Sequence, residues 1–215
     1  MDLVETIVAR NQVRADILAC ERCPLSSTQT PVPFRGPTPA KVMILCDAPT
    51  VLDSRHNTSF MGAEGKFLSE QLAEVGIDMS TCFMANTICC VPPNGAPSVE
   101  AMHACTHHLR KQVHLADPEW VLALGKVAMS VMGIRSTLAK MHGRPFLQDV
   151  GPFRDRWIFP TYHPGSALAV GKDVTSKLPT VRADLSTFRD VMRSTLALDT
   201  VKVRIGRGGK PYFYQ

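Results

Sequence analysis

Four short apolar segments, each followed by a stretch of helical periodicity, constrain most strongly what this chain can fold into. The segments span residues 41–46, 82–87, 120–124 and 156–161 and read KVMILC, CFMANT, WVLAL and RWIFPT. Short apolar runs of this kind are typical of buried strands, and strands that alternate with helices predict a parallel sheet covered on both faces. We therefore expect an α/β fold with three layers (α/β/α) around a central, mostly parallel, four-stranded sheet.

Helical periodicity extends over residues 2–20, 65–75, 98–116, 126–132 and 180–196. Ser98 follows Pro97 and is a suitable N-cap, while Gly76 and Gly133 are typical helix stops. The first helix is expected to end near the first pair of cysteines. Residues 139–155 show no clear period, so we expect a loop or a hairpin there.

The composition favours one compact domain. The chain has 215 residues, of which 45% are hydrophobic and 20% charged, and we expect the domain to span residues 1–200. Residues 201–215 carry basic but no acidic side chains and a Tyr-Phe-Tyr run, which predicts a basic, aromatic tail or hairpin. The N-terminal residues contain no apolar stretch of signal-peptide or membrane-spanning length, so we expect a cytoplasmic protein that does not bind a membrane.

The net charge of +5 is unevenly distributed along the chain. From Arg135 onward there are 14 Lys and Arg against 6 Asp and Glu, whereas residues 1–134 hold 10 against 13. The basic half has the charge needed to face the phosphates of a nucleic acid. A charge excess of this size is equally typical of proteins in which it only increases solubility. Nucleic-acid binding and solubility therefore both stay open as explanations.

Polar side chains stand at the ends of the apolar segments, where ligands bind in an open α/β sheet. Asp47 follows the first segment, with Asp53 a little further on. Asn86 lies at the end of the second segment, and His163 follows the fourth. Each residue taken singly is explained as a loop cap or a packed neutral histidine. Their shared position at one rim of the sheet favours a binding site instead.

An amide, an imidazole and a carboxylate at one rim suit the release of a pyrimidine from a sugar. The Asn86 amide both donates and accepts hydrogen bonds, which matches the O4 and N3–H edge of uracil. Cleavage of the glycosidic bond builds negative charge on the departing base and positive charge on the sugar. His163 is suited to hydrogen-bond O2 of the base, and Asp47 or Asp53 to stand near the sugar.

The chain has seven cysteines and no secretion signal, which favours metal binding over disulfide bonds. Cys20 and Cys23 form a C-x-x-C pair, and Cys90 and Cys105 follow further along the chain. Four thiolates suit either a zinc ion or an iron–sulphur cluster, and the spacing does not distinguish them. The remaining cysteines are interpreted as thiols outside the metal site: Cys46, Cys82 and Cys89.

Eight motifs, spread between about Cys20 and Asp190, occur in a fixed order. They are CERCPL, LCDAPTVLD, SFMGAEGKFL, NTICCVPPNGAP, Cys105, ALGKVA, HGRPF and TYHPGSAL. In this order the chain resembles the family 4 uracil-DNA glycosylases, which carry a [4Fe-4S] cluster and belong to the uracil-DNA glycosylase superfamily. The resemblance implies a monomeric prokaryotic or phage-encoded enzyme that acts on single- or double-stranded DNA and leaves an abasic site.

The resemblance also selects the cofactor and its ligands. Cys90 directly precedes a Val-Pro-Pro that stands where the family has Arg-Pro-Pro. The cluster ligands implied in this way are Cys20, Cys23, Cys90 and Cys105. The cofactor is then an iron–sulphur cluster rather than zinc, with a structural role.

Roles at the rim follow from the same resemblance. Phe60 matches the aromatic residue that stacks on a flipped-out uracil, Asn86 the asparagine that reads the pyrimidine, and His163 the histidine that supports O2. Residues 164–168 match a loop that probes the minor groove of the duplex, beginning with Pro164, Gly165 and Ser166.

The chain departs from the family at one loop. Where the family has Gly-Glu-Ala-Pro-Gly, residues 46–50 read Cys-Asp-Ala-Pro-Thr, and Asp53 matches a later acidic position. Glycine permits a close backbone approach to the base, so Cys46, Ala48 and Thr50 are expected to alter the floor and mouth of the pocket. The sequence therefore leaves three functions open: release of uracil, release of a modified pyrimidine connected with phage DNA, or DNA binding without catalysis.

Overall fold

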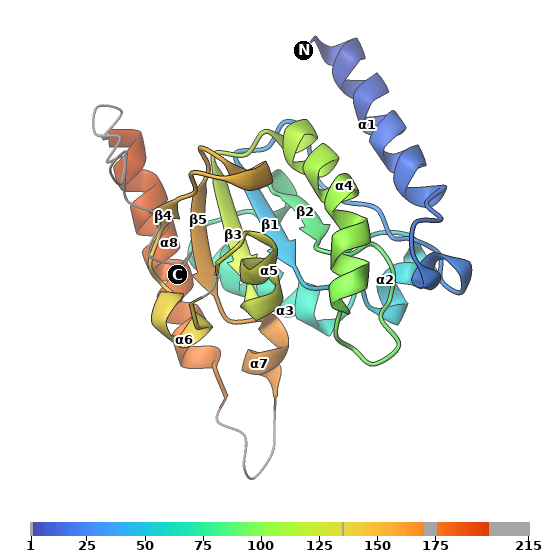
Figure 1. The fold of residues 1–215 in the computed structure, drawn as a ribbon. Coiled ribbons are helices and arrows are strands. Elements are labelled where there is room, and N and C mark those ends of the chain that lie inside the picture. Colours follow the sequence, from blue (N-terminus) through green and yellow to red (C-terminus); the bar gives the residue numbers. More distant parts are fainter. Residues whose placement is uncertain (1, 135, 170–175, 198–215) are drawn as a thin grey trace.

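The computed structural model describes residues 2–134, 136–169 and 176–197. One sheet lies at its centre, with the strand order β2-β1-β3-β5-β4 (Figure 1). The strands are β1 (Val42–Cys46), β2 (Phe83–Asn86), β3 (Trp120–Leu124), β4 (Phe146–Leu147) and β5 (Trp157–Thr161). β4 pairs antiparallel with β5, and the other pairings are parallel. The predicted mostly parallel α/β fold is therefore confirmed.

The sheet has five strands, and the expectation of four was wrong in this respect. Each of the four predicted segments does form a strand, with bounds that differ by at most one residue at either end. The additional strand, β4, is only two residues long, which is too short to show the alternation that identifies a strand in a sequence. It supplies the hairpin that had been expected as one alternative for residues 139–155.

The strands bury side chains on both faces of the sheet. Met43 and Leu45 pack into the core on one face, while Val42 and Ile44 pack into the core on the other. All five residues of β1 are buried as a result. Burial on both faces explains why the strands appear in the sequence as continuous apolar runs rather than as alternating apolar and polar residues.

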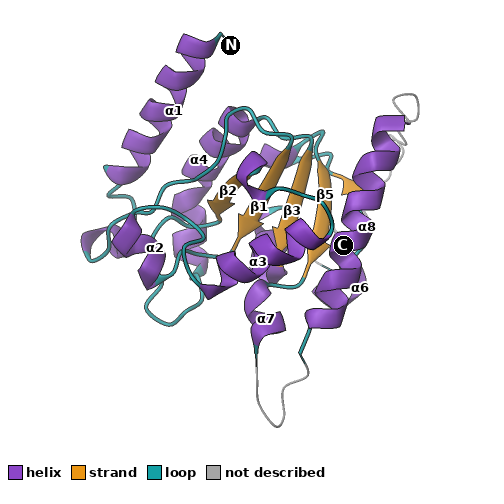
Figure 2. Ribbon diagram, turned by 180° about the vertical axis from the view of Figure 1, so that it is seen from behind, coloured by secondary structure: helices purple, strands orange, loops and turns teal. Residues whose placement is uncertain are grey.

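Helices form the outer layers on the two faces (Figures 1 and 2). The core on one face takes residues from α1 (Leu3–Leu18), α4 (Val99–Ala116), α5 (Gly125–Val131) and α6 (Leu138–Met141). The core on the opposite face takes residues from α3 (Ala63–Glu74), α7 (Pro164–Leu168) and α8 (Leu178–Ala197). A further short helix, α2 (Val51–His56), follows β1. The sequence did not reveal α2, α6 and α7, because helices of four to six residues are too short to show a period.

The predicted helix ends are confirmed. Ser98 is the N-cap of α4, and its hydroxyl accepts a hydrogen bond from the backbone N–H of Ala101 at 3.1 Å. Gly76 and Gly133 follow α3 and α5 with φ of 76° and 77°, a backbone conformation that glycine adopts without strain. These local signals therefore fix where the helices begin and end.

The predicted tail at residues 201–215 lies outside the described residues. The division into a domain of residues 1–200 and a tail stays a prediction for the same reason. None of the helices in the described ranges is both long and apolar enough to cross a membrane.

Candidate active site

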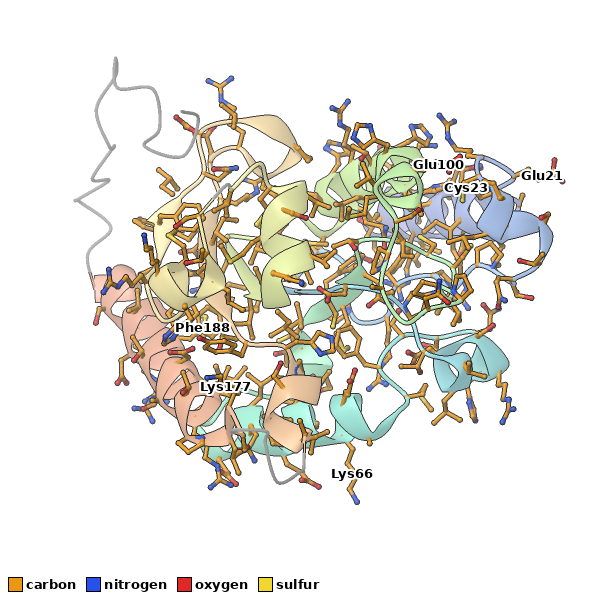
Figure 3. The ribbon with its side chains drawn as sticks, turned by 60° about the horizontal axis from the view of Figure 1, so that its bottom comes forward. Glu21, Cys23, Lys66, Glu100, Lys177 and Phe188 are labelled. Carbon is orange, nitrogen blue, oxygen red and sulfur yellow. The ribbon has the colours of Figure 1, made fainter. Side chains whose placement is uncertain are left out.

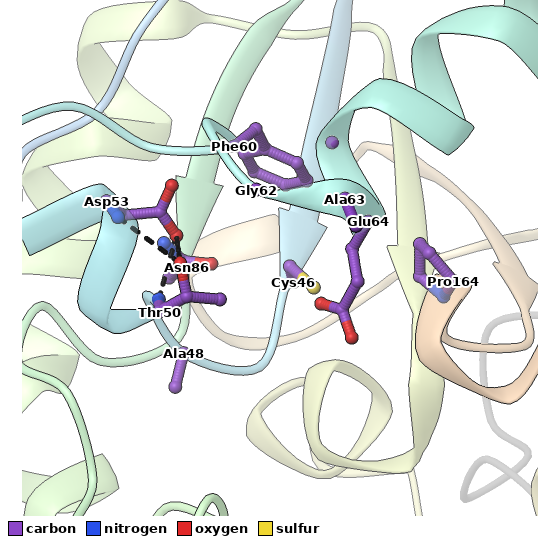
Figure 4. Close-up of a pocket in the computed structure, with 11 residues that line it drawn as sticks. Cys46, Ala48, Thr50, Asp53, Phe60, Gly62, Ala63, Glu64, Asn86 and Pro164 are labelled. Carbon is purple, nitrogen blue, oxygen red and sulfur yellow. Dashed lines mark hydrogen bonds between the residues drawn. The ribbon is translucent and has the colours of Figure 1, made fainter. Parts of the chain in front are cut away.

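The carboxyl ends of the parallel strands bring the predicted rim residues together. Cys46 and Asn86 are direct neighbours in the register of β1 and β2, and His163 follows the end of β5 by two residues. A pocket opens at this edge of the sheet (Figure 4). Its lining consists of Cys46, Ala48, Thr50, Asp53, Phe60, Gly62, Ala63, Glu64, Gly65, Asn86 and Pro164.

Phe60 is held in the pocket wall by an unusual backbone. Its φ is 64°, in the left-handed region that a bulky residue rarely adopts. The next backbone N–H, that of Met61, donates to Oδ1 of Asp53 at 2.6 Å. A Cβ at Gly65 would lie 2.2 Å from the carbonyl oxygen of Phe60, so only glycine at position 65 leaves room for this backbone. Strain that the surroundings enforce in this way is typical of functional sites.

Asp53 and Thr50 form a reciprocal cap at the start of α2. Oδ2 of Asp53 accepts hydrogen bonds from the backbone N–H and the hydroxyl of Thr50, at 2.7 and 2.8 Å. Oδ1 accepts the bond from Met61. The buried Asp53 carboxylate thus joins the N-terminus of α2 to the segment that carries Phe60. The sequence predicted Asp53 near the sugar, whereas these hydrogen bonds give it a structural role.

Asn86 lines the pocket from the end of β2 and is 6% exposed. Its Nδ2 donates to the hydroxyl of Ser59 at 3.4 Å, and that hydroxyl donates to the carbonyl oxygen of Pro33 at 3.0 Å. The side-chain amide is therefore held in one orientation before any ligand arrives.

The ring of His163 has a defined tautomer. Its Nδ1 accepts a hydrogen bond from the backbone N–H of Gly165 at 3.1 Å, so the proton of the neutral ring is on Nε2. Nε2 lies 3.0 Å from Sγ of Cys46 and donates to it. Burial raises the pKa of the Cys46 thiol well above its usual value, and the neighbouring Asp47 adds to the effect. The Nε2–H group of His163, which was expected to hydrogen-bond O2 of a base, thus points at Cys46 in the pocket floor.

Asp47 lies near His163 but outside the lining of the first pocket. Both residues line a second hollow, together with Gly125, Lys126, Ser136, Thr137, Leu138, Gly165, Ser166 and Ala169. Burial raises the pKa of Asp47, opposed by the nearby His163. Within the described part of the chain, Oδ1 of Asp47 has no hydrogen-bond partner. A Cβ at Gly125 would come within 3.3 Å of that oxygen, so the glycine leaves space beside it.

Glu64 was not identified from the sequence. It belongs to the first turn of α3, where an acidic residue is ordinary, so its position gave no signal of a site. In the structure its side chain lines the pocket, with Oε1 3.8 Å from Nδ1 of His163. Figure 4 shows it extending into the region between Cys46 and Pro164.

The predicted minor-groove segment begins at this same corner. Residues 164–168 form the short helix α7, which corrects the expectation of a loop, and His163 is its N-cap. Pro164 lines the first pocket, while Gly165 and Ser166 line the second hollow. The structure therefore brings all three next to His163.

Five of the seven cysteines gather at one corner: Cys20, Cys23, Cys89, Cys90 and Cys105. Cys20 follows α1, and Cys23 precedes a 3₁₀ helix at Pro24–Ser27. Leu25 of that helix packs against a small core that contains Cys105 of α4. Figure 3 shows Cys23 and Glu100, in the first turn of α4, on the same side of the molecule.

The thiols in this corner influence the pKa of one another. Burial raises the pKa of Cys90 to about 12, and Cys105, Cys23 and Cys20 add to the shift. A hydrogen bond from Cys89 lowers the pKa of Cys105 to about 7. Cys89 is therefore part of this corner, although the sequence had suggested a spare thiol.

The donor set of this corner fits an iron–sulphur cluster, because soft thiolates are the ligands that such clusters take. Four thiols from three segments of the chain meet there, because Cys20, Cys23 and Cys105 all act on Cys90. In the described ranges, no three His, Cys, Asp or Glu side chains already stand around a single metal position.

Comparison with known proteins agrees with this architecture. The model of the uracil DNA glycosylase superfamily matches residues 33–185. The chain is 30% identical over 167 residues to the Type-4 uracil-DNA glycosylase of Sulfurisphaera tokodaii. This alignment covers 73% of this chain and 74% of the relative. It is 31% identical over 156 residues to the Type-4 enzyme of Pyrobaculum aerophilum (69% and 79% covered) and 29% identical over 153 residues to that of Thermotoga maritima (69% and 78%). The chain belongs to the uracil DNA glycosylase superfamily.

Proposed function

We propose that this protein is a DNA glycosylase that hydrolyses the N-glycosidic bond of uracil, or of a related pyrimidine, and leaves an abasic site in DNA. One observation carries the proposal: Cys46, Phe60 and Asn86, from three separate segments, line one pocket, and His163 is hydrogen-bonded to Cys46 in that lining. An aromatic face, a fixed amide and an imidazole are the groups needed to hold and release a flipped-out pyrimidine. The names of the relatives support the same activity.

In this proposal the base enters the pocket and stacks on Phe60. Asn86, already oriented by Ser59, hydrogen-bonds the Watson–Crick edge of the base. Nε2–H of His163 donates to O2 and stabilises the negative charge on the leaving base, in place of its present bond to Cys46. Ala48 and Thr50 shape the mouth of the pocket beside them.

The acidic residues have different parts. Asp47, buried beside His163, stabilises the positive charge that develops on the sugar. Asp53 acts indirectly, because its carboxylate holds the backbone next to Phe60. Pro164, Gly165 and Ser166 contact the DNA from the start of α7.

Cys20, Cys23, Cys90 and Cys105 would hold a [4Fe-4S] cluster. When bound, the cluster supplies a cross-link between the N-terminal segment and α4, and the glycosylase reaction requires no electron transfer from it. We further propose that the protein acts as a monomer in the cytoplasm, on single- or double-stranded DNA.

The decisive experiment measures base release from oligonucleotides that differ only in one base. The arms carry uracil, 5-hydroxymethyluracil, glucosylated 5-hydroxymethylcytosine or unmodified thymine, in single and double strands, and Asn86→Ala is the control variant. Release of uracil by the wild type, lost in the variant, supports the main proposal. Release of only a modified base would mean that the reaction is the proposed one but that its substrate is the modified base. The altered loop at residues 46–50 would explain that preference. DNA binding without release of any base contradicts the proposal and favours a silent DNA-binding homologue.

A further inference from the structure

The base pocket contains a carboxylate that the roles assigned above do not use. Of the residues that line it, only Asp53 and Glu64 are acidic. Both oxygens of Asp53 accept hydrogen bonds from neighbouring backbone or hydroxyl groups. Asp47 lines the second hollow rather than this pocket. Glu64 is therefore the acidic side chain in the pocket lining that remains available for a ligand.

The Glu64 carboxylate lies on the side of the pocket nearest to His163. Its Oε1 is 3.8 Å from Nδ1 of His163. Nδ1 already accepts the N–H of Gly165, so the neutral ring has no proton to give to Glu64. The two groups are neighbours that are not hydrogen-bonded to each other in this state.

The start of α7 makes room for this carboxylate. A Cβ at Gly165 would lie 2.5 Å from Oε1 of Glu64, so glycine at this position allows the carboxylate to occupy the corner between Pro164 and Cys46 (Figure 4). The side chain of Glu64 is 37% exposed and can therefore hold a water molecule. Burial is the main cause of the raised pKa of Cys46 and of Asp47, and the charge of Glu64 adds a smaller contribution to both.

Hydrolysis of an N-glycosidic bond needs a water molecule beside C1′ of the sugar and a negatively charged group that binds this water and accepts its proton. Both must act together with the group that stabilises the leaving base. We propose that Glu64 is a catalytic residue that binds the attacking water beside C1′ of the deoxyribose and removes its proton. This proposal rests on the glycosylase function proposed above.

The step balances as a hydrolysis. The bond between C1′ and the base nitrogen breaks, and its electron pair leaves with the base, which is stabilised by His163. The water oxygen forms a bond to the resulting oxocarbenium carbon. One water proton passes to Glu64 and then to the released base, so the products are the neutral base and a C1′ hydroxyl on an abasic site.

The test uses single-turnover kinetics of the full chain with the oligonucleotide from which the wild type releases its base. Glu64→Gln keeps the shape of the side chain and removes its charge. It is expected to lower the rate of base release by about 100-fold, the typical contribution of one general base. The matched control is Glu70→Gln, which changes an exposed glutamate of the same helix, paired with Lys66, and is expected to keep the wild-type rate.

Two further measurements separate catalysis from binding or folding. Affinity for DNA that carries non-hydrolysable 2′-fluoro-2′-deoxyuridine, or the matching fluoro analogue of the released base, should change less than threefold in Glu64→Gln. Added formate should restore part of the rate of Glu64→Ala, because it replaces the missing carboxylate.

The outcomes are distinct. A Glu64→Gln rate within threefold of the wild type, or a loss confined to affinity, overturns the role of Glu64 and leaves the glycosylase function intact. A wild-type chain that releases no base from any of the substrates overturns both proposals.

Discussion

Sγ of Cys46 lies 3.0 Å from Nε2 of His163, and this contact uses the only proton of the neutral imidazole. The two residues come from the ends of different strands, and the thiol is 5% exposed. Cys46 thus competes with a bound base for the same donor.

Replacing Cys46 with glycine, the residue found in the related family, should therefore speed up the release of the base. A neutral hydrogen bond has a net value of about 1 kcal/mol, which predicts a rate about fivefold higher in single-turnover assays. Cys82→Ala is the control, because Cys82 is an equally buried thiol outside the pocket lining. A slower Cys46→Gly enzyme would show that the thiol assists His163 rather than competing for its proton.

Gly65→Ala should disturb Phe60 although it adds only one carbon. The new Cβ would lie 2.2 Å from a backbone oxygen, so the segment that carries Phe60 must move. We expect unfolding free energy to fall by about 2–3 kcal/mol, and base release to fall with it. Gly62→Ala, at the N-cap of the same helix, is the matched control, because its Cβ would have the Thr50 hydroxyl at 3.7 Å, an ordinary contact. Equal thermal stability of the two variants would refute this account of the Phe60 backbone.

Cys90 and Cys89 should differ in their effect on the cluster. Cys90→Ser is expected to lose iron and to lower the melting temperature, because one cluster ligand and its cross-link disappear. Cys89→Ser, at the adjacent position, should keep its iron. Iron content by mass spectrometry and thermal unfolding provide the two measurements. The reverse pattern would assign the ligand to Cys89, the thiol that is hydrogen-bonded to Cys105.

The stability of the protein should fall in alkaline solution, in part because of Cys82. Burial raises the pKa of this thiol to about 11, whereas a thiol in the unfolded chain titrates near 8.5. Below the lower value both states carry the protonated thiol, and the contribution to stability is complete. As the pH rises from about 8.5 to 11, the unfolded state loses its proton first, so the free energy of unfolding decreases by roughly 1–3 kcal/mol.

Cys82→Ala should accordingly show a flatter dependence of unfolding free energy on pH over this range. Met79→Ala, a truncation in the same core, is the control and should lower stability equally at each pH. Parallel curves for the wild type and Cys82→Ala would contradict the prediction. Chemical denaturation at a series of pH values provides the measurement.

Local patterns predicted most of the fold. The strands and long helices were visible because each depends on periodicity or on a cap within a few residues, as at Ser98. The elements that were missed are short: β4, α2 and α7 have two to six residues and owe their form to what surrounds them. β4 forms because β5 offers it a partner, and α2 begins where Thr50 and Asp53 cap each other.

The sequence by itself determined which polar side chains lie at or just after the ends of the strands, namely Asp47, Asn86 and His163. It also determined which thiols are available for a cluster. Only the tertiary structure decided how these groups are used. It directed His163 at Cys46, placed Asp47 in a separate hollow, tied Asp53 to the backbone beside Phe60 and turned Glu64 into the pocket. The reason is that residue type and spacing fix what a side chain can do, whereas its partners come from segments that meet only when the sheet assembles.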